Sequence, residues 1–150
     1  MKILCLRYPR NTVTDIIICL LCSFMIILIV SNGKTAVNTS GNDISDVVAF
    51  IEENGWEIDY SSVCTAIKKI PESFDKVYSD YNELQQKQGF DLSGFKGKTV
   101  YQYTYSLLNL PGFENSDDIF VNILMYDGVI CAADICCTSI NGFITGVVRK

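Results

Sequence analysis

Residues 70–98 decide the fold of this chain, and they read IPESFDKVYSDYNELQQKQGFDLSGFKGK. Pro71 suits the first turn of a helix, where its missing N–H would have no partner anyway. Apolar and aromatic residues then recur with the spacing of one helix face: Phe74, Val77, Tyr78, Tyr81 and Leu84. Gly89 can adopt the left-handed conformation that often ends a helix. The stretch therefore predicts a helix from about Pro71 to Gly89, followed by a loop that reaches Lys98.

A second helix is expected just before this stretch, between Asp43 as its cap and Gly55 as its end. Its buried face would carry Ile44, Val47, Val48 and Ile51. Glu52 and Glu53 fall in its last turn, where acidic side chains oppose the helix dipole, so this helix must depend on packing. Alternation of apolar and polar residues predicts short strands at residues 56–60, 63–70, 99–108 and 143–148.

The strongest hairpin signal is Asp127-Gly128, because both positions of such a two-residue turn need positive φ. A turn of this kind pairs Tyr126 with Val129 and, counting outward, Val121 with Asp134. Residues 119–126 and 129–137 are apolar on both faces, so this hairpin is expected in the middle of a sheet. The expected fold class is α+β, with two helices packed on one face of an antiparallel sheet of about five strands.

The N-terminal part reads as a membrane segment. Residues 16–30 are apolar and uncharged, and Lys2, Arg7 and Arg10 precede them. Counted from residue 13, the run reaches the lower limit for crossing a bilayer, and the basic residues place the N-terminus in the cytoplasm. We therefore expect a cytoplasmic tail and single-pass anchor in residues 1–33, a linker in 34–42, and an extracytoplasmic domain in 43–150. A signal peptide, cleaved to release a secreted domain, has a similar start, and a lipoprotein signal at Cys22 is a third interpretation.

Composition excludes several classes of function. Residues 34–150 carry nine basic and sixteen acidic side chains, a net charge of −7, and no basic cluster. A surface of this kind has no electrostatic footprint for nucleic acid. The chain has no histidine, which removes Ser-His-Asp and Cys-His catalysis and His-ligated zinc. We therefore expect neither an enzyme, nor a metal, nor a cofactor; a histidine-free hydrolase remains the minor alternative.

Cysteines, tyrosines and one aspartate are the candidate site residues. Cys64 could form a disulfide with one of Cys131, Cys136 and Cys137, or all four could stay free. Asp134 is an acid in an apolar strand. It is either a hydrogen-bonded structural carboxylate or a ligand contact with a raised pKa. Three tyrosines share one strand face and form either core or a binding platform: Tyr101, Tyr103 and Tyr105.

Several short motifs carry a family resemblance over roughly residues 43–146. They are Gly55-Trp56-Glu57, Ile70-Pro71 with Phe74, Tyr78 and Tyr81-Asn82, Gln85 with Gln88-Gly89-Phe90-Asp91-Leu92, Lys96-Gly97-Lys98, Tyr103, Tyr126-Asp127-Gly128, Asp134, and Asn141-Gly142-Phe143. In these residues the chain resembles a bacterial family known as a domain of unknown function, number 4830. The family pattern has glycines where this chain has Cys131, Ala132 and Ala133. The resemblance implies a domain behind a membrane segment or lipoprotein signal, and it implies no catalytic residue.

Taken together, these observations predict a membrane-tethered extracytoplasmic binding module. Residues 13–30 would hold it in the membrane, and its partner would be an unknown protein, peptide or envelope ligand. The candidate binding surface consists of Tyr101, Tyr103, Tyr105 and Asp134. The alternatives are a small-ligand-binding domain and a structural envelope domain.

Overall fold

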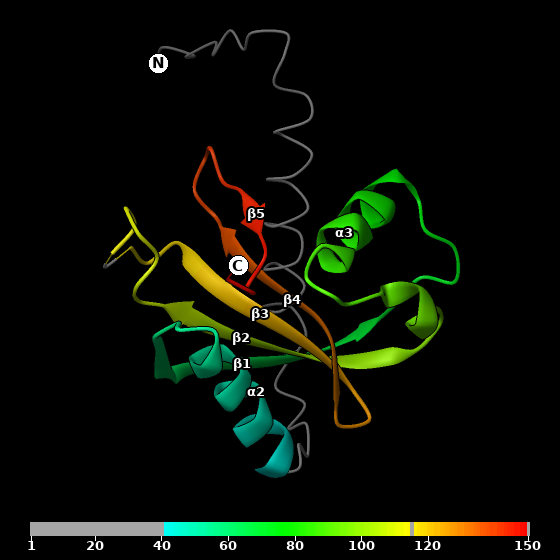
Figure 1. Ribbon diagram of the computed structural model, residues 1–150, viewed down its shortest axis with the longest axis horizontal. Coiled ribbons are helices and arrows are strands. Elements are labelled where there is room, and N and C mark those ends of the chain that lie inside the picture. Colours follow the sequence, from blue (N-terminus) through cyan, green and yellow to red (C-terminus); the bar gives the residue numbers. More distant parts are fainter. Residues whose placement is uncertain (1–40, 115, 150) are drawn as a thin grey trace, which may run out of the picture.

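The computed structural model describes residues 41–114 and 116–149. In chain order its elements are α2 (Gly41–Glu53), β1 (Ile58–Lys69), α3 (Lys76–Gln86), the short 3₁₀ helix η1 (Leu92–Phe95), β2 (Thr99–Leu107), β3 (Ile119–Tyr126), β4 (Val129–Cys137) and β5 (Ile144–Thr145). The strands form one antiparallel sheet in the order β1-β2-β3-β4-β5 (Figure 1). The predicted α+β class with a five-stranded sheet is therefore confirmed.

The predicted membrane segment, residues 13–30, lies outside the described residues. Within residues 41–114 and 116–149, no helix combines the length and the apolar character needed to cross a bilayer.

Helix α2 covers one face of the sheet, which we call the first face (Figure 1). Val47 and Ile51 of α2 are fully buried there against the inward-facing residues of the middle strands, such as Tyr103 and Ile123. Each of these large apolar side chains contributes about 1.5–3 kcal/mol through burial. The predicted apolar stripe of this helix is thus confirmed at Val47 and Ile51 and in part at Val48, whereas Ile44 is 37% exposed.

The expectation that both helices share one face is wrong. Helix α3 lies beside the outer edge of β4 (Figure 1). There the side chain of Gln85 accepts a hydrogen bond from Ala133 N (2.9 Å), and that of Gln88 donates one to Ala133 O (3.0 Å). These amides continue the pairing of β4 where the two-residue strand β5 has ended. Part of the second face is apolar and also needs cover, and Leu92 and Val100 belong to a separate buried cluster there.

The buried face of α3 also differs from the predicted stripe. The helix begins after Asp75, whose side chain caps Tyr78 N, rather than at Pro71. Its buried residues are Asn82 and Gln85, whereas Val77 is 43% exposed. Hydrophobic spacing could not reveal this face because polar side chains make it. Gly89 does follow the helix with φ +94°, as predicted.

The Asp127-Gly128 turn is confirmed, with φ values of 49° and 77° and Tyr126 opposite Val129. Beyond Leu124 the pairing shifts by one residue at a β-bulge, so Asp134 faces Asn122 instead of the expected Val121. A shift of one residue moves the following side chains to the other face of the sheet. Asp134 therefore lies on the second face. Residues 56–60 and 63–70, predicted as two strands, form the single strand β1 with an irregularity between Asp59 and Cys64.

Candidate functional site

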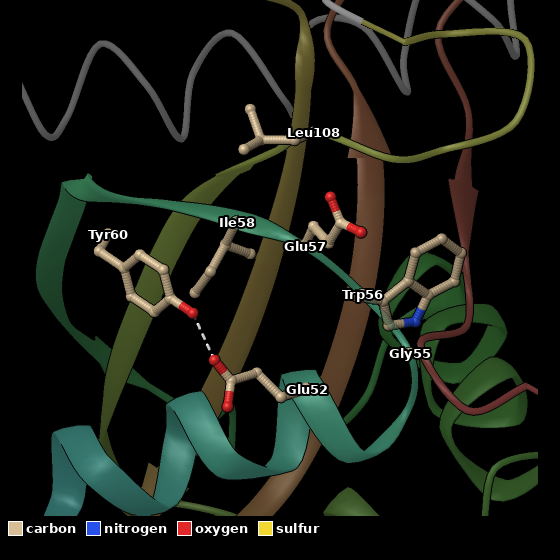
Figure 2. Close-up of a pocket in the computed structure, with 7 residues that line it drawn as sticks. All are labelled: Glu52, Gly55, Trp56, Glu57, Ile58, Tyr60 and Leu108. Atoms are coloured by element: carbon tan, nitrogen blue, oxygen red, sulfur yellow. Dashed lines mark hydrogen bonds between the residues drawn. The ribbon is translucent and has the colours of Figure 1, made fainter.

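A hollow of about 510 Å³ opens where the end of α2, the start of β1 and the end of β2 meet. Figure 2 shows the side chains that surround it. Ile58 is 3% exposed and forms its floor, while Tyr60 and Leu108 are 60% and 45% exposed and form its walls. Its remaining lining residues are Glu52, Gly55, Trp56 and Glu57. The hollow is therefore apolar at its base and open to solvent above.

The position of Trp56, the single tryptophan of the chain, is fixed by bonds on two sides of its ring. The indole Nε1 donates a hydrogen bond to Val147 O at 2.7 Å. The guanidinium of Arg149 lies 3.7 Å from the ring centroid, within cation–π distance. Gly55, with φ +75°, makes the turn from α2 into β1, and a side chain there would press against Arg149 at 3.3 Å. The tryptophan is thus a rigid wall of the hollow.

Acidic groups dominate the charge around the hollow. The hydroxyl of Tyr60 donates a hydrogen bond to a carboxylate oxygen of Glu52 (Figure 2). This bond raises the pKa of Tyr60, so the phenol stays protonated. Glu57 is exposed beside them, and its backbone N–H is held by the Asn109 side chain at 3.0 Å. No lysine or arginine is among the residues that line the hollow.

A row of polar side chains crosses the second face of the sheet. Asn122 is its centre: its Oδ1 accepts hydrogen bonds from Gln102 Nε2 (2.9 Å) and Thr104 Oγ1 (2.7 Å), and its Nδ2 donates to Asp134 Oδ2 (2.9 Å). The other oxygen of Asp134 accepts a bond from the Tyr81 hydroxyl at 2.6 Å. The polar row therefore ties β2, β3 and β4 to α3.

The carboxyl group of this row is buried in the sheet. Asp134 is 6% exposed. Burial raises its pKa, while the bonds from Tyr81 and Asn122 act in the opposite direction. Burial and the neighbouring carboxyl group also raise the pKa of Tyr81 well above its usual value. Every oxygen of Asp134 has a partner, so this carboxyl group serves as a structural junction.

The tyrosines predicted as a binding platform do share one face, but this face is the core. Tyr103 and Tyr105 are 0% and 2% exposed and belong to the cluster beneath α2. Tyr101 is half-buried and packs against the same cluster. They are separated from Asp134, which lies on the opposite face. The predicted candidate surface is therefore not assembled as one surface.

The structure does not bring Cys64 close to the cysteines of β4, with which a disulfide was considered. No disulfide joins any two of the four cysteines among the described residues. Cys64 lies on β1 and Cys136 on β4, with two strands between them. Neighbouring strands lie about 4.8 Å apart, so the separation is about 14 Å, whereas a disulfide needs Cα atoms within about 7 Å. Nor do three Cys, Asp or Glu side chains gather into a metal-holding group anywhere in residues 41–114 and 116–149.

Sequence reasoning missed the hollow. Tyr60 was expected in a short half-buried strand, and Glu52 was noted only as an unfavourable helix end. The signal that could have located the hollow is Gly55-Trp56-Glu57, a rigid aromatic flanked by a turn glycine and an acid. Its meeting with Leu108 depends on the tertiary pairing of β1 with β2.

The model of one family, described as a domain of unknown function (DUF4830), matches residues 50–135. This match covers more than half of the 150 residues and includes every residue that lines the hollow and every member of the polar row. No curated protein and no solved structure matches the chain. The chain therefore belongs to the DUF4830 family.

Proposed function

We propose that this chain is a binding module rather than an enzyme, and that its ligand binds in the hollow beside Trp56. The observation that carries this proposal is the hollow itself. Its volume of about 510 Å³ lies within the range of about 300–1,000 Å³ that is usual for ligand sites. It combines an apolar floor with a few polar groups at the rim, which is the usual composition of such sites.

The walls of the hollow favour binding over a purely structural role. Tyr60 and Leu108 expose 60% and 45% of their surfaces, although both are large and apolar. The hydrogen bond to Val147 O and the stacked Arg149 guanidinium hold the Trp56 ring in one position. Rigid aromatic side chains lose little conformational freedom when a ligand covers them, so they suit a recognition surface.

The polar row on the second face is a weaker candidate. Its members already bond to one another, so a ligand would have to replace existing hydrogen bonds. Such an exchange brings little net free energy, because each new bond is offset by the loss of an old one. The small-ligand alternative is thus best placed at the hollow as well.

We also propose that the module is tethered outside the cytoplasm by residues 13–30. The apolar run and the basic residues before it support this placement. Protease added to intact spheroplasts should digest residues 43–150 and spare the cytoplasmic tail. Complete protection of the domain, with digestion only after lysis, would contradict the proposal.

Fluorescence of Trp56 tests the binding proposal. The full chain in non-ionic detergent would be titrated with three probes: acetyl-Ala-Lys-Ala-amide, acetyl-Ala-Glu-Ala-amide and the N-acetylglucosamine trimer. We expect a saturable change with at least one probe. Leu108→Ala should weaken it, and Val129→Ala, a similarly exposed apolar residue at the distant hairpin turn, should not. No saturable change with any probe would contradict the proposal.

A further inference from the structure

We infer that the hollow takes the ammonium group of a lysine side chain presented by a peptide partner. This inference rests on the proposed function and adds the chemical class of the ligand. It follows from the charge at the rim, the shape of the floor and the contacts already made by Arg149.

The rim carries two carboxylates, while the nearby Arg149 guanidinium stacks on Trp56. Glu52 and Glu57 are both exposed at the hollow. The ion pairs of the described domain are Lys69–Glu72 and Lys76–Asp80, so neither glutamate takes part in one there. A ligand cation that entered the hollow could therefore form an ion pair with either carboxylate without displacing an ion pair within the described residues.

The end of α2 adds to this charge. Glu52 lies in the last turn of α2, which contains no basic residue. The C-terminus of a helix carries a partial negative charge, so an acidic residue there is unfavourable and a cation is favourable. A bound ammonium group would relieve the repulsion between Glu52 and the helix end. The charges at the end of α2 therefore favour a positively charged ligand in the hollow.

The floor suits the aliphatic part of a lysine. The exposed side chain of Leu108 on the wall offers most of the apolar surface, with Ile58 beneath it, and methylene groups packed on such surface leave the charged end at the rim. The ring of Tyr60, held in place by its bond to Glu52, stands beside the path of the chain. A cation near this ring gains a further attraction to its face.

The chain itself already places a cation on a neighbouring wall. The guanidinium of Arg149 stacks on Trp56 at 3.7 Å, so the indole face is occupied. A second cation must therefore turn to Glu52 and Glu57 instead. Lysine fits this arrangement because its compact ammonium group ends a flexible four-carbon stem, which can lie along the apolar surface while the charge reaches either carboxylate.

Titration of the full chain with acetyl-Ala-Lys-Ala-amide tests the inference, with Trp56 fluorescence as the readout and the Nε-acetylated peptide as the neutral comparison. We expect acetylation to weaken binding at least about tenfold. Glu52→Gln should weaken it about three- to fivefold, the scale of one exposed ion pair. Glu53→Gln is the matched control: it removes the same charge from the next residue, which does not line the hollow, and should weaken binding less than twofold.

The outcomes separate the ligand class from the site. Equal binding of both peptides, or binding of the N-acetylglucosamine trimer alone, would overturn the lysine inference and leave the hollow as a site. Equal effects of Glu52→Gln and Glu53→Gln would also overturn the inference, because the general acidity of the domain would then explain binding. Absence of binding by every probe would overturn both proposals.

Discussion

The polar row makes Asp134 the most informative residue for the stability of the fold. Asp134→Ala removes the acceptor of two buried hydrogen bonds and leaves Tyr81 Oη and Asn122 Nδ2 without this partner. Each buried donor that loses its partner costs about 1–3 kcal/mol, so we expect the loss of two to lower the free energy of unfolding by about 2–6 kcal/mol. Asp134→Asn keeps the shape and most of the bonding, so its loss should stay within about 1 kcal/mol.

The raised pKa of Asp134 also predicts how the difference in stability between the wild-type chain and Asp134→Asn changes with pH. A carboxyl group whose folded pKa lies above its ordinary value of 3.8 favours the folded state in its protonated form. Its contribution is complete below about pH 4 and is lost as the pH rises through the folded pKa. The wild-type chain should therefore lose stability relative to Asp134→Asn as the pH is raised from 4 to 8.

Urea unfolding of the full chain in non-ionic detergent would be measured by circular dichroism across this pH range. It gives both the free energy lost on substitution and its dependence on pH. Taking the difference between the two proteins removes the contribution of other acids. A wild-type chain that instead loses stability relative to Asp134→Asn on acidification would refute the reasoning. It would show that the bonds from Tyr81 and Asn122 outweigh burial.

Three further predictions concern α3 and its surroundings. Gly89→Val should lower the free energy of unfolding by about 1–2 kcal/mol from backbone strain alone, since φ is +94° and no atom lies near an added side chain. Gly94→Val is the control: the space around it is equally open, and the loss should stay below about 0.5 kcal/mol. Equal melting curves for the two variants would contradict this prediction. Gln88→Ala removes the acceptor of the Val147 N–H, bonded at 2.6 Å, and should speed the hydrogen exchange of that amide; unchanged exchange would show that Gln88 does not hold this segment. Bonds from its serine and asparagine neighbours lower the pKa of Asp91 to about 2, so the advantage of wild type over Asp91→Asn should vanish as the pH falls from 4 to 2, and constancy over that range would contradict it.

Local signals predicted the parts of the fold that local sequence controls. The Asp127-Gly128 turn needs only two residues with positive φ, and it appears where expected. The alternation in residues 99–107 correctly placed Tyr101, Tyr103 and Tyr105 on one face. Their burial could not be predicted, because it depends on which face α2 covers.

Three features of the structure lay beyond sequence reasoning. The β-bulge beyond Leu124 places Asp134 on the other face of the sheet. No residue type in the hairpin predicts this bulge. The buried side of α3 is built from amides such as Gln85, which a hydrophobic period cannot detect. The hollow joins Glu52 at the end of α2, Trp56 just before β1 and Leu108 just after β2, so it exists only once β1 has paired with β2.

The position of ligand-induced changes in the structure shows directly whether the hollow is the binding site. Backbone amide chemical shifts of the full chain would be recorded during titration with acetyl-Ala-Lys-Ala-amide. We predict that the largest changes occur at Glu52, Glu57 and Tyr60. Changes centred instead on Thr104 and Asn122, on the opposite face of the sheet, would contradict the claim.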